Sequence, residues 1–178
     1  MTYRGTSERY GGVAVAIHWA SALVIVGALV SGFQAAGLLD PVARTGLLRI
    51  RVPCGLAAVA LTLARIGGWL ADRRPDPISG MDRLQARLAH GTHFVIYAAL
   101  VVMGASGVGM LVLSGAGAVP SGAKAASVLP DFWAYAPRIP HGACARLLSG
   151  ILVLHVGAAL YHQFIRRDGL MRRMPLGA

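Results

Sequence analysis

Four long apolar segments divide the chain, and they limit its fold more than any other feature. They run over residues 12–33, 47–70, 88–113 and 143–165. Each has about 20 residues or more, enough to cross a hydrocarbon core of roughly 30 Å as a helix rising about 1.5 Å per residue. Helices satisfy their backbone groups within each segment, as lipid requires. We therefore predict an all-α fold: an integral membrane four-helix bundle, forming one domain over residues 1–178.

The composition agrees with membrane spans and argues against a soluble domain. The chain is 56% hydrophobic and 13% charged, whereas a soluble domain carries about 25% charged residues. The net charge of +10 at pH 7 comes from residues that largely flank the apolar segments. Such placement indicates orientation in a membrane rather than nucleic-acid binding. We expect no cleavable signal peptide, because the first apolar segment is too long for one and has no obvious cleavage site.

The basic residues also predict an orientation. Eleven of the 17 Lys and Arg residues fall on the side of the termini, namely Arg4, Arg9, Arg65, Arg73, Arg74, Arg83, Arg87, Arg166, Arg167, Arg172 and Arg173. The others are Arg44, Arg49, Arg51, Lys124, Arg138 and Arg146. Because cytoplasmic loops are richer in Lys and Arg, we expect both termini in the cytoplasm. The two sides are called inner and outer in the sense of this prediction.

Two histidines lie at similar depths in the first and fourth segments. His18 lies about two turns into the first helix, and His155 about three turns from the inner end of the fourth, at depths of roughly 9–15 Å. An ionisable residue inside a span is costly and is a functional hypothesis by default, although a helix-packing hydrogen bond is the alternative. Two neutral imidazoles that face each other across a bundle can bind both axial positions of one haem iron.

His141 adds a second level to the fourth segment. It lies 14 residues before His155, and four helical turns take about 14.4 residues, so both share a face about 21 Å apart. This spacing suits one helix that offers a ligand to an inner and an outer haem. A partner for His141 would come from the outer start of the second segment, where Arg51 stands. Arginine stays protonated and cannot ligate iron.

The two cysteines, Cys54 and Cys144, both lie near the outer side. Cys54 follows Arg51 by about one turn and can offer a thiolate to a haem iron. The pair can also form a disulfide in an oxidising compartment, or simply pack as small apolar side chains.

Three further histidines gather near the inner boundary. His90 and His93 begin the third segment, and His162 follows His155 by seven residues on the same helical face. They can be interfacial residues in contact with water or lipid headgroups. Alternatively, they form a proton-coupled site beside a haem, where a quinone takes up electrons and protons.

Several blocks of the sequence match one known family. They are residues 17–20, 52–56 with Arg65, 88–90, 93–97, His141, 155–162, 167–170 and 173–174. On these residues the chain resembles the prokaryotic cytochrome b561 family, a group of di-haem four-helix proteins that includes a superoxide:ubiquinone oxidoreductase. The resemblance extends from about Tyr10 to Met174.

The resemblance implies a multi-pass cytochrome of the bacterial inner membrane. It implies haem b, electron transfer to ubiquinone or another quinone, and superoxide as a donor attracted by basic outer residues. In the family, the histidine matching His18 pairs with that matching His155 on the inner haem. The histidine matching His141 pairs with one on the second helix at an outer haem, and Arg51 occupies that position here. A five-coordinate haem, a haem with a substitute ligand and no outer haem are all open outcomes.

Three hypotheses of function follow. The first is a haem b electron carrier or quinone oxidoreductase, carried by His18, His141 and His155. The second is a haem-poor membrane anchor or partner subunit, motivated by Arg51 and by the long connection over residues 114–140. The third is a transition-metal site around His90 and His93, which lacks Asp or Glu ligands within the spans.

Overall fold

The computed structural model describes residues 4–71, 75, 82–118 and 129–174. Within these residues, four long helices follow one another without a strand: α1 (Gly12–Gly37), α2 (Pro41–Ala71), α3 (Arg83–Leu113) and α4 (Arg138–Tyr161). All four are long and apolar enough to cross a membrane. This confirms the predicted all-α, four-helix membrane fold. Its orientation in the membrane stays a prediction, and Arg73, Arg74 and Lys124, which that prediction counted, lie outside the described residues.

Short helical turns complete the chain. The 3-10 turns are η1 (Ala116–Ala118), η3 (Phe132–Ala134) and η5 (Leu170–Arg173). A π-helical turn, η4 (His162–Arg166), continues α4. The chain then leaves the helix through Arg167 and Gly169, which both have positive φ.

Three of the four helices, α2, α3 and α4, start earlier than the predicted apolar segments. The second helix, α2, begins at Pro41, six residues before the predicted position 47. Proline at a first helical position has a suitable φ and lacks only a donor that would be unpaired there. The Asp40 carboxylate accepts from the backbone N–H groups of Val42 and Ala43 at 3.2 and 3.0 Å. The apolar pattern did not predict the first turns of α2, because they contain polar residues that extend the helix beyond its apolar part.

The third and fourth helices also begin in polar sequence. Asp82 caps α3 by accepting from the backbone N–H of Gln85 at 2.7 Å. The fourth helix begins at Arg138, five residues before the predicted position 143. His141 therefore belongs to α4 itself, which the predicted face shared with His155 requires.

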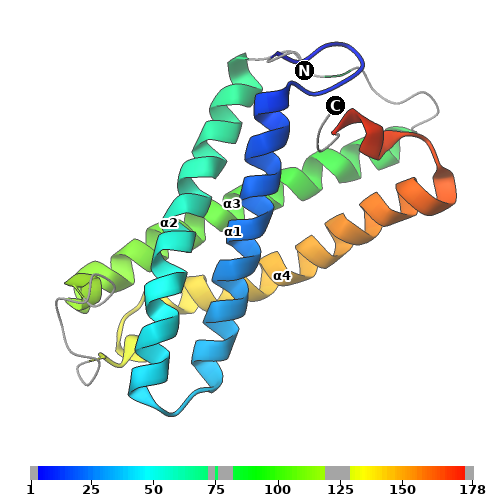
Figure 1. Ribbon diagram of the computed structural model, residues 1–178. Coiled ribbons are helices and arrows are strands. Elements are labelled where there is room, and N and C mark those ends of the chain that lie inside the picture. The colour runs from blue at the N-terminus through cyan, green and yellow to red at the C-terminus, as the bar shows by residue number, and fades with distance from the viewer. Residues whose placement is uncertain (1–3, 72–74, 76–81, 119–128, 175–178) are drawn as a thin grey trace.

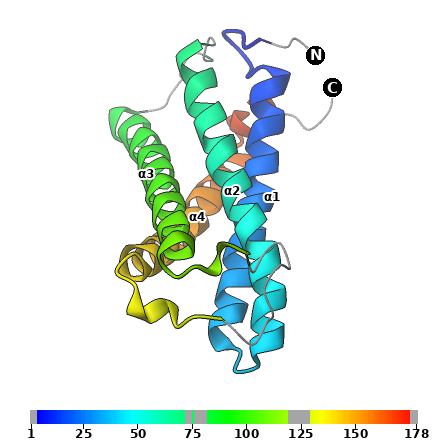
Figure 2. The same ribbon diagram turned by 90° about the vertical axis from the view of Figure 1, so that its left-hand side faces the viewer.

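The helices form two hairpins that cross. In Figure 1, α1 and α2 run side by side, and α3 and α4 cross behind them at a steep angle. Figure 2 shows the same hairpins from the side. The core joins all four helices through Ile25, Ala58, Ile96, Ala99, Leu100 and Leu148. Many large apolar side chains face outward instead, with Leu23 76% exposed, as expected of a lipid-facing surface.

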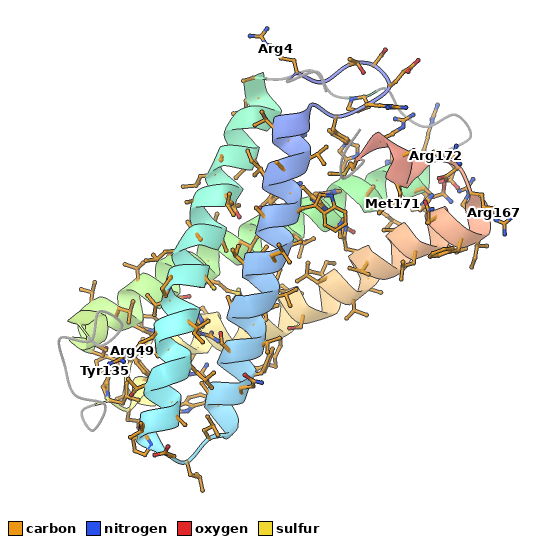
Figure 3. The ribbon with its side chains drawn as sticks, viewed as in Figure 1. Arg4, Arg49, Tyr135, Arg167, Met171 and Arg172 are labelled. Carbon is orange, nitrogen blue, oxygen red and sulfur yellow. The ribbon has the colours of Figure 1, made fainter. Side chains whose placement is uncertain are left out.

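The start of α1 and the end of α4 lie at the same end of the molecule (Figures 1 and 2). There, the backbone N–H of Tyr10 donates to the carbonyl of Arg173 at 3.1 Å. Arg4, Arg167 and Arg172 project at this inner end, and Arg49 and Tyr135 lie at the outer end (Figure 3). Both ends therefore carry positive charge, as the sequence indicates.

Candidate functional site

Three histidines from three helices meet in the inner half of the bundle. The ring centroids of His18 on α1 and His155 on α4 are 6.3 Å apart. Those of His93 on α3 and His155 are 5.3 Å apart. All three side chains are half-buried. We call this set the inner histidine cluster.

Arg65 joins this cluster from α2. Its guanidinium donates to Nδ1 of His18 at 2.6 Å and to the hydroxyl of Tyr97 at 3.2 Å. Arg65 was predicted to lie among the inner charges that flank the membrane, and the structure corrects this, because the side chain lies half-buried between helices. A signal was available: Arg65 lies 14 residues after Arg51, the same spacing that puts His141 and His155 on one face.

The indole of Trp19 adds an unpaired donor beside the cluster. Its ring packs edge-on against His18, with centroids 5.5 Å apart. Its buried Nε1–H has no acceptor among the described residues. Buried donors nearly always have a partner. The unpaired indole therefore favours a bound group with an acceptor atom at this position.

His90 does not reach the cluster. Its side chain is exposed, and Nδ1 donates to the carbonyl of Ala86 at 2.7 Å. His93, three residues later, donates from Nδ1 to the carbonyl of Ala89 at 2.8 Å and points inward. The two were predicted to act together, and the structure separates them because side chains three residues apart still differ by about 60° around the helix axis.

His162 forms a second arrangement at the inner end. Its Nδ1–H donates to the Asp168 carboxylate at 2.5 Å, and both side chains are largely buried, at 14% and 16% exposure. Burial alone would raise the pKa of Asp168. The hydrogen bonds from His162 and from the backbone of Leu170, together with the charge of Arg166, instead hold that pKa below its usual value. Asp168 was part of the matching sequence blocks but was not predicted to act on His162.

At the outer level, His141 meets Arg51. The Arg51 guanidinium lies 2.8 Å from Nε2 of His141 and donates to the carbonyl of Ala28 at 3.2 Å. His141 is 9% exposed. On its other side, Nδ1 lies 3.0 Å from the carbonyl of Met103 and 3.1 Å from the Ser106 hydroxyl. Arg51 is therefore not a free surface charge, contrary to its place among the predicted outer charges.

The remaining candidates have simpler environments. Cys54 and Cys144 are both free thiols and half-buried, which agrees with packing as small apolar groups rather than with a disulfide. The described residues contain no group of three or more His, Cys, Asp or Glu side chains arranged to hold a metal ion. Nothing in that part of the chain favours the transition-metal hypothesis.

Comparison with known proteins identifies the family of this chain. The family model for prokaryotic cytochrome b561 matches residues 9–177. The chain belongs to the prokaryotic cytochrome b561 family. One relative, the probable superoxide oxidase CybB of Yersinia pestis, is 26% identical over 176 residues, which cover 94% of this chain and 97% of that protein. The chain is thus a multi-pass bacterial membrane protein and a b-type cytochrome of electron transfer.

The inner histidine cluster fits the haem that this family implies. Two nitrogens bound on opposite sides of one metal ion lie about 4 Å apart, because each metal–imidazole bond is about 2 Å long. The two ring centroids lie further apart than the two bound nitrogens by half a ring on each side, which makes their separation roughly 6 Å. The His18–His155 separation of 6.3 Å agrees with this value. The unpaired Trp19 indole is consistent with a bound group at the same place.

Proposed function

We propose that this chain exchanges electrons between one haem b, held by His18 and His155, and a membrane quinone at the inner surface. The single observation that carries the proposal is the 6.3 Å separation of these two rings across α1 and α4. The haem supplies one-electron exchange. Trp19 and Arg65 offer donors beside it that suit the carboxylates of a haem.

His162 is proposed to serve the quinone. Its Nδ1–H is held by Asp168, so Nε2 is the nitrogen left to exchange a proton with a quinone oxygen. It lies seven residues after His155, about 10 Å along the helix axis. A quinone that takes two electrons must also take two protons to become a quinol. A histidine beside the haem site at the inner surface can pass such protons.

Superoxide is the proposed donor at the outer end. Each superoxide ion gives up one electron and leaves as O2, so two ions are consumed for each quinol formed. Arg44, Arg49 and Arg146 lie at this end, and Arg138 stacks over Trp133 with its guanidinium carbon 4.2 Å from the ring centre. Clustered positive charge can raise the encounter rate of an anion by about 10-fold or more.

Quinol kinetics test the proposal. The purified protein should bind haem b that is reduced by a short-chain quinol in a stopped-flow measurement. His162→Ala should keep the full Soret absorbance but slow this reduction by about 10-fold or more, because a positioned acid–base group is lost. His90→Ala is the matched control, since His90 is exposed and touches neither arrangement, and its kinetics should equal those of the wild type.

Two results would contradict the proposal. Unchanged quinol kinetics in His162→Ala would remove the role assigned to His162. A wild-type protein without haem after expression with ample haem supply would favour the haem-poor anchor or partner subunit instead.

A further inference from the structure

We infer that Arg51 closes the outer half of the bundle to a second haem, so that the chain binds a single haem. The inference rests on the proposed function for its inner haem and concerns different residues. Its basis is the position of one side chain between α1 and α4, opposite the buried His141. The inner and outer levels of the bundle then have different chemistry.

The guanidinium of Arg51 occupies the place where an axial partner of His141 would have to be. It comes from α2 and reaches the carbonyl of Ala28 on α1 at 3.2 Å and Nε2 of His141 on α4 at 2.8 Å. These two short contacts span the space between the helices. A guanidinium has only donors, so it cannot itself replace the missing iron ligand.

The hydrogen-bond partners of His141 determine which of its ring nitrogens carries the proton. Because Arg51 donates to Nε2, the ring proton sits on Nδ1, which donates to the carbonyl of Met103 at 3.0 Å. A carbonyl that holds Nδ1–H is the usual support of a histidine whose Nε2 binds a metal. His141 is thus oriented as a ligand would be, but its one free lone pair is used by Arg51.

Glycines on two neighbouring helices lie against the Arg51–His141 pair. A Cβ added to Gly32 on α1 would lie 1.1 Å from Nη1 of Arg51. The guanidinium therefore fills the room that this glycine provides. On the other side, a Cβ on Gly107 would lie 3.3 Å from Cε1 of His141. The residues at this level fit an arginine–histidine pair and do not fit a haem.

The pair also changes the electron path across the membrane. His141 and His155 are 14 residues apart on α4, about 21 Å along the axis. Without an outer haem, an electron that superoxide gives up at the outer surface would have to cross most of that distance to the inner haem without an intermediate carrier, so reduction of the inner haem by superoxide should be slow in the wild type. Arg51→His should supply the missing imidazole opposite His141.

Haem counting tests this directly. Haem per chain would be measured by the pyridine haemochrome assay on full-length protein purified after expression with ample haem. We expect about one haem in the wild type and about two in Arg51→His, since two imidazoles can then bind one iron. The double variant Arg51→His/His141→Ala should return to about one. Arg49→His is the matched control, because Arg49 is exposed two residues away, and it should gain none.

The outcomes separate this inference from the proposed function. About two haems in the wild type, with one lost in His141→Ala, would overturn the inference and leave the inner site intact. A folded Arg51→His protein that gains no haem would also overturn it. A wild type without haem would overturn the inner assignment, whereas a gain in Arg51→His that His141→Ala removes would still support closure by Arg51. If Arg51→His does not fold, equal counts in wild type and His141→Ala support the inference.

Discussion

Arg65 and Arg51 donate to different ring nitrogens of their histidine partners. Arg51 donates to Nε2 of His141, whereas Arg65 donates to Nδ1 of His18. A donor on Nδ1 leaves the proton of a neutral ring on Nε2, and a nitrogen that carries a proton cannot bind iron. Haem binding through Nε2 of His18 therefore requires Arg65 to release Nδ1. The Tyr97 hydroxyl, 3.2 Å from Nε of Arg65, remains as its acceptor.

Asp168 gives a pH-dependent prediction. The pKa of this carboxyl is lower in the folded protein than its usual value. A carboxyl of this kind adds stability above its unfolded pKa of about 4, and the contribution is lost as the pH falls through the folded pKa. Asp168→Asn should lower the melting temperature by a few degrees above about pH 5, and the difference from wild type should shrink in more acidic buffer.

Thermal unfolding in detergent, followed by circular dichroism over a pH series, would measure this difference. Asp131→Asn is a suitable control, because Asp131 caps only the short η3 turn at the outer end. A difference that stays constant down to the most acidic buffer would show that the Asp168–His162 contact does not stabilise the fold.

The close approach of α2 and α3 depends on Gly104. A Cβ at this position would lie 2.3 Å from Cγ2 of Val59, and the branched Val59 side chain has little freedom to turn away. Gly104→Ala should therefore destabilise the protein by about 1–3 kcal/mol, the usual cost of overpacking. Gly91→Ala on the same helix meets nothing within 4 Å and serves as the control. Equal melting temperatures for the two variants would contradict the packing described.

Helix existence was predictable from sequence, and helix ends were less so. Apolar length alone identified all four helices, because lipid leaves few alternatives for such segments. The starts at Pro41, Arg83 and Arg138 lie in polar sequence. There, capping residues rather than hydropathy determine the residue at which a helix begins. The shared face of His141 and His155 followed from spacing within one helix.

Contacts between helices were harder to predict. The direction of a long side chain such as Arg65 depends on neighbours from other helices, and one sequence does not give these. Likewise, His90 and His93 differ by three residues, and only the packing of α3 decides which one faces the cluster. Arg51 was recognised at the right position, but its contact with His141 required the tertiary structure.

The two ends of the molecule carry different arrangements of histidine side chains. The inner end holds the histidine cluster and the His162–Asp168 pair, and the outer end holds the Arg51–His141 pair. The two hairpins cross so that His18 on α1 and His155 on α4 face each other at the inner level. This asymmetry accounts for a proposed single haem near the proposed quinone position, with the basic outer surface at a distance.

The axial ligation of the haem tests the central claim most directly. Electron paramagnetic resonance of the oxidised, purified protein should give a low-spin signal of iron with two imidazole ligands. We predict that His18→Ala and His155→Ala each abolish this signal and most of the bound haem, while His90→Ala keeps both. Retention of the wild-type low-spin signal in both His18→Ala and His155→Ala would contradict the account.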